Sequence, residues 1–151
     1  MECLHYKLLN RQVIKQKNNA GSFNDAKAFQ KPVTCKGSKL YIVKANHDIL
    51  YVGITSQSIS ARLRYGFTAA GKHGYHGYKW KDHKGELDIF IWCFDGKNQQ
   101  PYVEAIEAEV VFEIRKQTGS WPFFQTEIHF HKATNEQICL ARKICNAVLE
   151  N

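Results

Sequence analysis

Two short apolar runs near residue 45 are separated by a polar break. The runs cover residues 39–45 and 49–55, and the Asn-His-Asp break between them suits a tight turn. This pattern predicts an antiparallel β-hairpin. If the loop holds an odd number of residues, Tyr41 and Tyr51 project from the same face of the sheet, whereas a two-residue loop would place them on opposite faces.

A helix is predicted directly after the hairpin. The stretch from 55 to 58 offers serine and threonine as N-cap residues. The apolar stripe of this helix repeats every fourth position, at Ile59, Leu63 and Phe67. Arg62 lies beside the stripe, so its stem can pack while its guanidinium reaches the edge of the domain, and Arg64 is the alternative on the other flank.

The later apolar segments predict one more strand and two helices. Residues 86–94 are apolar on both parities, which is typical of a strand covered on both faces. Pro101 suits a helix start, and helical spacing continues to a stop at Gly119. A Thr-x-x-Gln capping box opens a closing helix over about 134–149. The sequence therefore predicts an α/β fold with a three-stranded, mainly antiparallel sheet flanked by helices.

The first 38 residues have the least regular pattern. They are rich in lysine, asparagine and glutamine, and their scattered apolar residues allow a helix over about 3–16 followed by a loop. A helix packed on the core and an arm that binds DNA are both compatible with this composition.

Charge and composition indicate a soluble protein with a polyanionic partner. The formal net charge is +7 and the sequence pI is about 9.2, so nucleic acid is attracted to the surface. No apolar stretch reaches the roughly 18 residues of a membrane span, and the first residues lack the apolar block of a signal peptide. The five cysteines lack paired spacing, which favours reduced thiols and a cytoplasmic location.

Residues 71–84, GKHGYHGYKWKDHK, interleave cations with aromatic rings. Such a segment can bind phosphates through its cations and bases through its rings, although the same rings can anchor a loop to the core. The nucleic-acid contacts predicted in this segment are Lys72, His73, His76, Lys79, Trp80 and Lys81.

The order of these features resembles the GIY-YIG nuclease family. Leu-Tyr at 40–41 matches the Ile-Tyr of the first motif and Tyr-Val-Gly at 51–53 matches the second, while Lys39 replaces the glycine that opens the first motif. Arg62 follows near the position of the family's helical arginine. The segment IEAE at 106–109 resembles the helix that carries the family's metal-binding carboxylate.

The resemblance covers about residues 39–127 and sets the expected domain organisation. We expect a single domain over 1–151, with an N-terminal extension over 1–38 and the C-terminal helix over about 134–149.

This resemblance implies a divalent-metal-dependent endonuclease that acts on duplex or branched DNA. Tyr41 is expected to be the general base, with neighbouring cations lowering its phenol pKa, and Tyr51 to position water or phosphate. Arg62 is expected on the scissile phosphate, where a guanidinium can bind two oxygens. A glutamate that holds one Mg²⁺ or Mn²⁺ would stabilise the developing charge, and the resemblance favours Glu109 for this role.

Helical periodicity alone leaves the metal-binding carboxylate open. Glu107 and Glu113 lie at least as close to the apolar stripe as Glu109, and Glu127 is a further candidate. The polar residue that the family carries after this helix corresponds to Gln125, which is expected to contact nucleic acid. His73 and His76 are candidates for a proton relay or for a phosphate contact.

Other kinds of site fit the sequence less well. His129 and His131 form an HxH pair, but the cysteines that follow at 139 and 145 lack the CxxC spacing of structural zinc sites. Cys93 lies in an apolar strand, where nothing nearby would lower a thiol pKa. The stronger alternative is a non-catalytic nucleic-acid-binding module on the same fold, which would be indifferent to loss of Glu109.

Overall fold

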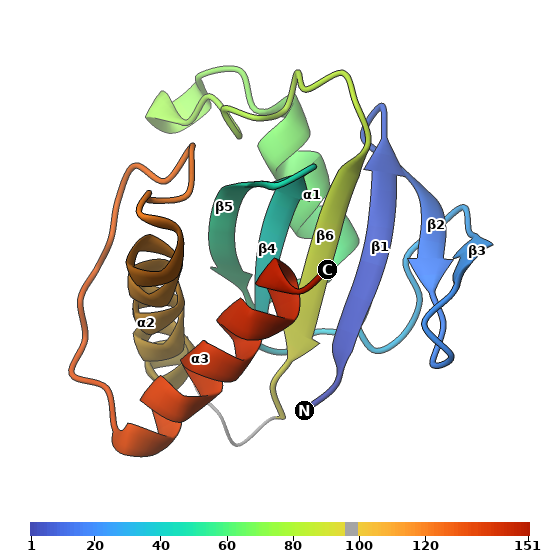
Figure 1. The fold of residues 1–151 in the computed structure, drawn as a ribbon. Coiled ribbons are helices and arrows are strands. Elements are labelled where there is room, and N and C mark those ends of the chain that lie inside the picture. Colours follow the sequence, from blue (N-terminus) through green and yellow to red (C-terminus); the bar gives the residue numbers. More distant parts are fainter. Residues whose placement is uncertain (96–99) are drawn as a thin grey trace.

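The protein folds as an open six-stranded sheet with helices on both faces (Figure 1). The computed structural model describes residues 1–95 and 100–151. The strands are β1 (Cys3–Leu9), β2 (Gln12–Lys17), β3 (Phe23–Asp25), β4 (Lys39–Ala45), β5 (Asp48–Thr55) and β6 (Leu87–Cys93). The helices are α1 (Ile59–Thr68), α2 (Gln100–Thr118) and α3 (Asn135–Leu149), with a short 3-10 turn η1 (Lys72–Gly74) after α1.

The strand order is β3-β2-β1-β6-β4-β5, and every neighbouring pair is antiparallel. The predicted α/β class is confirmed. The predicted sheet of three strands is too small, because the N-terminal residues add three strands beside β6.

The N-terminal residues form a β-hairpin instead of the helix over 3–16 that the sequence allowed. Asn10 and Arg11 have φ angles of 49° and 66°, and a two-residue type I′ turn requires positive φ at both positions. β1 lies between β2 and β6, and it buries residues of both parities. The apolar spacing that looked helical therefore belongs to a central strand.

Each face of the sheet carries its own apolar layer. α1 packs on one face, whereas α2 and α3 cover the other (Figure 1). Alternate residues of β4 divide between the layers, with Tyr41 and Val43 on the α1 side and Leu40 and Ile42 on the α2 side. β6 divides in the same way, which confirms the prediction that residues 86–94 are covered on both faces.

The β4–β5 hairpin keeps its two tyrosines together by a route that the sequence did not predict. Its loop holds two residues, Asn46 and His47, and not an odd number. A β-bulge follows at Leu50, which has no partner in β4. Because side chains alternate along a strand, this extra residue offsets the even loop, and Tyr41 and Tyr51 project from the same face.

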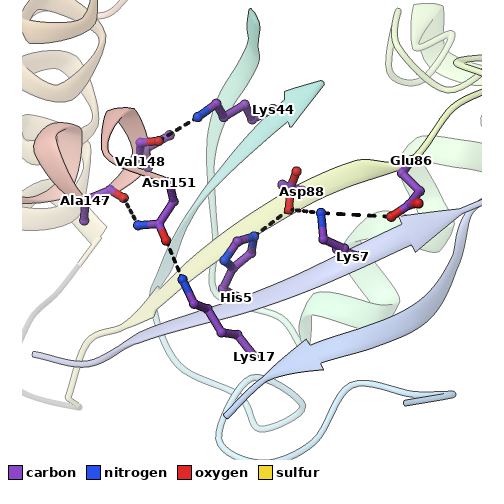
Figure 2. Close-up of polar contacts among 9 residues, drawn as sticks. All are labelled: His5, Lys7, Lys17, Lys44, Glu86, Asp88, Ala147, Val148 and Asn151. Atoms are coloured by element: carbon purple, nitrogen blue, oxygen red, sulfur yellow. Dashed lines mark hydrogen bonds and ion pairs between the residues drawn. The ribbon is translucent and has the colours of Figure 1, made fainter. Parts of the chain in front are cut away.

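Lysines from two strands hold the C-terminal end of α3 (Figure 2). The buried ammonium of Lys44 donates to the Val148 carbonyl at 2.9 Å. Lys17 donates to the side chain of Asn151, whose amide donates in turn to the Ala147 carbonyl at 2.7 Å. Carbonyls of a last helical turn lack partners within the helix and attract cations, so these lysines stabilise the docked helix.

The ends of the other helical segments match the predicted signals. Thr134 and Gln137 form the capping box, with backbone-to-side-chain hydrogen bonds of 2.8 and 3.3 Å. Gly119, with φ of 82°, follows the last residue of α2 as predicted. Within residues 1–95 and 100–151, the helices are too short or too polar to cross a membrane.

Candidate active site

Tyrosines from two strands and a loop meet an arginine of α1. The hydroxyls of Tyr41 and Tyr78 lie 2.7 Å apart, and the Tyr51 ring centroid lies 6.0 Å from that of Tyr41. The Arg62 guanidinium stands 4.9 Å from the centroid of the Tyr78 ring. It also donates a hydrogen bond of 3.3 Å to the Tyr75 hydroxyl. The structure thus brings together the two tyrosines and the arginine that the motifs singled out.

Gly53 makes room for this cluster of rings. It is paired with Tyr41 across the hairpin. A Cβ atom at Gly53 would lie 2.6 Å from the Tyr41 hydroxyl oxygen and 2.7 Å from a ring carbon of Tyr51. Real Cβ atoms do not approach other atoms so closely, so the glycine of the Tyr-Val-Gly segment has a steric reason.

Tyr41 is fully buried, and its pKa moves opposite to the expectation. Burial raises the phenol pKa well above its ordinary value, and the neighbouring phenols of Tyr78 and Tyr51 raise it further. Arg62 acts in the lowering direction without offsetting the burial. The prediction of a lowered pKa is therefore wrong, because loss of solvent outweighs the nearby cation.

Tyr51 opens onto a pocket of about 210 Å³ between β5, α2 and the segment that follows α2. The polar residues that line it are Tyr51, Glu107, Gln125, Thr126, Glu127 and His129. Burial also raises the pKa of Tyr51, and Arg62 opposes that shift. Tyr51 is partly exposed and lines this pocket, whereas Tyr41 is fully buried.

Glu107 is the half-buried carboxyl group of this pocket. Its pKa is raised to about 7, first by burial and then by the carboxylate of Glu104. Within the described parts of the chain, the Glu107 side chain has no hydrogen bond and no ion pair. Binding of a cation beside an unpaired, half-buried carboxylate is favourable, because the cation stabilises the ionised form.

The other candidate carboxylates have different surroundings. Glu109 lies two residues beyond Glu107, about 200° around α2, and does not line the pocket. Glu113 is buried between α2 and α3, where it accepts a 3.1 Å hydrogen bond from Arg142. Glu127 lines the pocket but is exposed. Among these four glutamates, Glu107 and Glu127 line the pocket, and Glu107 is the less exposed of the two.

Gln125 fixes the segment after α2 along the outer edge of the sheet. The backbone amides of Phe123 and Phe124 donate to carbonyls of β5 at 2.9 and 2.8 Å. The side-chain oxygen of Gln125 accepts a 3.1 Å hydrogen bond from the Val52 amide. An edge strand leaves such groups unpaired, so these bonds hold the far wall of the pocket beside Tyr51.

The segment over 71–84 divides into buried anchors and exposed cations. Tyr78 and Trp80 are buried with their rings stacked at a centroid distance of 4.4 Å, so the Trp80 ring is not exposed for the nucleic-acid contact predicted for it. Lys81 turns inward and donates to the His76 and Ala69 carbonyls at 2.7 and 3.2 Å. The predicted contacts with exposed side chains are Lys72, His73, His76 and Lys79.

Lys39 occupies the position where the family motif opens with glycine. Its buried ammonium donates to the carbonyls of Cys35, Gly37 and Gln57, at 2.5, 2.8 and 2.9 Å. It therefore joins the start of β4 to the loop that precedes α1. The departure from the motif has a structural role and leaves Tyr41 in place.

The two histidines of the zinc alternative pair with different carboxylates. The His131 ring lies 3.3 Å from a Glu104 oxygen, and the His129 ring lies 3.4 Å from Glu127. Residues 1–95 and 100–151 contain no group of three or more histidine, cysteine and acidic side chains arranged around a common metal position. All cysteines are free thiols, and burial raises the pKa of Cys93.

Models of known protein families, curated proteins and solved structures show no match to this chain. The relation to the GIY-YIG family therefore stays a prediction from the motif residues.

Proposed function

We propose that this protein is a divalent-metal-dependent endonuclease of the GIY-YIG type that hydrolyses phosphodiester bonds in DNA. One observation carries the proposal: Tyr51 of β5 and Glu107 of α2 line one pocket, and Arg62 lies close enough for its positive charge to lower the pKa of the Tyr51 phenol. Phosphodiester hydrolysis needs a cation on the phosphate and a carboxylate to hold a metal ion. The three residues come from the elements that the motifs predict.

The donor set at Glu107 fits Mg²⁺ or Mn²⁺. Mg²⁺ prefers oxygen ligands, is held by one or two carboxylates and keeps several waters. Glu107 offers one unpaired carboxylate in a pocket of about 210 Å³, which leaves room for those waters. When bound there, the ion would stabilise negative charge on the phosphate and lower the pKa of a coordinated water. We assign the metal to Glu107 in preference to Glu109.

Arg62 would bind the scissile phosphate. Its guanidinium is positioned by the Tyr75 hydroxyl and by the face of the Tyr78 ring. Because a guanidinium has five N–H groups, donors remain for two phosphate oxygens.

The two motif tyrosines would have different roles. A phenol is protonated near neutral pH at its ordinary pKa of 10.0, and burial raises the pKa of Tyr51 further, so this hydroxyl can donate a hydrogen bond to a phosphate oxygen or a water. Tyr41 would act as a positioning residue through its hydrogen bond to Tyr78. Activation of the attacking water therefore does not depend on a Tyr41 phenolate that exists before DNA binds.

Nicking of supercoiled plasmid tests the proposal. Wild-type protein should nick DNA in Mg²⁺ or Mn²⁺ and lose that activity when the metal is chelated. Arg62→Ala should lower the single-turnover rate by about 100-fold, and Arg62→Lys, which keeps the charge without the fork, should recover only part of it.

The non-catalytic nucleic-acid-binding module is the second candidate. It is favoured by the burial of Tyr41, which leaves that phenol without access to a substrate. Metal-independent DNA binding by wild-type protein, with no cleavage in either metal, would support the non-catalytic module and exclude the endonuclease.

A further inference from the structure

A second concave surface lies on the flank of α1 that faces away from Arg62. It is a groove of about 630 Å³ between α1, the β1–β2 turn and the segment at residues 27–29. Its polar lining includes Asn10, Arg11, Gln12, Lys27, Ser60 and Arg64. The N-terminal extension therefore forms one wall of the groove, and α1 forms the other.

The groove is positively charged. Arginine and lysine line it, and none of its lining residues is acidic. Arg11 is held in place, because it donates to the Phe67 and Lys81 carbonyls and to Asp82, at 3.1 to 3.2 Å. Arg64 and Lys27 are exposed, and their side chains have no hydrogen bond or ion pair within residues 1–95 and 100–151. Two cations are therefore available to an anion.

Helix geometry places this groove across α1 from Arg62. Arg62 and Arg64 are two residues apart, so they leave α1 about 200° from each other, on opposite flanks. The crest between the flanks is exposed and includes Ala61 and Tyr65. A helix is about 10–12 Å across, and the major groove of B-DNA, about 12 Å wide, admits one. A duplex lying over this crest can contact both flanks.

The length of the groove suits a run of phosphates. Ser60 and Thr68 both line it and are eight residues apart, which is about 12 Å along α1. One DNA strand carries a phosphate about every 3.4 Å along the duplex axis, so this length spans at most about three phosphates, the number reached when α1 runs parallel to that axis. The hydroxyls and amides among the lining residues are the neutral donors that usually accompany cations on a phosphate backbone.

We propose that this groove binds the sugar-phosphate backbone of DNA outside the scissile phosphate, independently of sequence. The location of the cut relative to the groove rests on the proposed function, but the binding itself does not. The extension over 1–38 would then be part of the DNA surface through the β1–β2 turn and Lys27, and not through a mobile arm.

DNA binding by matched double variants tests this inference. Lys27→Ala with Arg64→Ala removes two free cations from the groove, and Lys132→Ala with Lys143→Ala removes two exposed cations beside and within α3. Fluorescence anisotropy would report binding to a duplex of about 20–30 base pairs, without divalent metal, at about 50 to 200 mM salt. The groove pair should weaken binding about 10-fold and reduce the salt slope by about 1.8, since each phosphate contact contributes about 0.9.

The result separates this inference from the nuclease proposal. Equal affinities and salt slopes for the two double variants would contradict DNA binding by the groove, even if the wild-type protein cleaves DNA. A selective loss of binding in the groove pair would support it, even if the wild-type protein cleaves nothing. Thermal unfolding of each variant checks that all proteins compared are folded.

Discussion

The hydroxyl oxygens of Tyr41 and Tyr78 lie 2.7 Å apart in the protein interior. One tyrosine comes from the hairpin and the other from the segment after α1, so the hydrogen bond joins parts of the site that are 37 residues apart. In this hydrogen bond the Tyr41 hydroxyl has a structural role.

Tyr41→Phe should therefore affect stability more than catalysis. It leaves the Tyr78 hydroxyl buried without its partner, which should lower the free energy of unfolding by about 1–2 kcal/mol. The single-turnover nicking rate should fall less than about 10-fold, below the range expected for loss of a general base. Urea unfolding and plasmid nicking measure the two effects. A rate loss of several hundred-fold with unchanged stability would return the base role to Tyr41.

Gly53→Ala should distort the tyrosine cluster. The new Cβ would lie 2.6 Å from the Tyr41 hydroxyl oxygen, and overpacking of this kind costs about 1–3 kcal/mol. Gly85→Ala is the matched control, because its Cβ would meet only the exposed ring of His83, at 3.1 Å. Urea unfolding of both variants checks the difference, and equal stabilities would show that the rings at Gly53 yield freely.

Loss of Glu107 should stabilise the metal-free protein at high pH. The folded-state pKa of about 7 lies above the ordinary value of 4.5, so between these pH values the folded state holds a proton that the unfolded state has released. Stability contributed by this group therefore falls as pH rises from about 4.5 to 7. Glu107→Gln should be the more stable protein at pH 8, by about 3 kcal/mol, and not at pH 4. Urea unfolding in the presence of a metal chelator, at pH 4 and at pH 8, measures the stability difference between Glu107→Gln and wild type. The same difference at both pH values would be inconsistent with a raised Glu107 pKa.

Glu113→Gln should act in the opposite direction. Burial raises the pKa of Glu113, but hydrogen bonds from Arg142 and Gln117 outweigh it and leave the pKa lowered. The carboxylate therefore stabilises the fold above pH 4.5, and this contribution is lost as pH falls through the folded-state pKa. The variant should lose about 1–2 kcal/mol at pH 7, with partial solvent screening of Arg142, and keep its nicking rate. A selective loss of nicking would place Glu113 in the active site.

Local signals in the sequence were sufficient for the elements around the site. The two apolar runs around a polar turn predict the hairpin that carries Tyr41 and Tyr51. Apolar residues at every fourth position predict α1, which carries Arg62. The shared face of the two tyrosines was predicted for a reason that did not hold, because the even loop and the bulge at Leu50 compensate each other. Periodicity cannot show a bulge, since the extra residue is apolar like its neighbours.

Other features depend on contacts between distant residues. The apolar spacing of β1 is compatible with a helix because a central strand buries both parities. The Asn10-Arg11 turn, with positive φ at both residues, is what makes these residues a hairpin. Helical periodicity does not show which of Glu107 and Glu109 lies beside Tyr51, because tertiary packing decides which side of α2 faces β5. The burial of Trp80 depends on its stacking with Tyr78, which the composition of the basic segment does not reveal.

The most direct test compares the single-turnover nicking rates of Glu107→Gln and Glu109→Gln in Mg²⁺. The two substitutions make the same change of side chain and lie two residues apart on α2, so they differ in the position of the lost carboxylate and not in its chemistry. The metal role of Glu107 predicts a rate about 100-fold or more below wild type for Glu107→Gln and a near wild-type rate for Glu109→Gln. A Glu107→Gln protein that nicks DNA as fast as wild type would contradict the assignment of the active site.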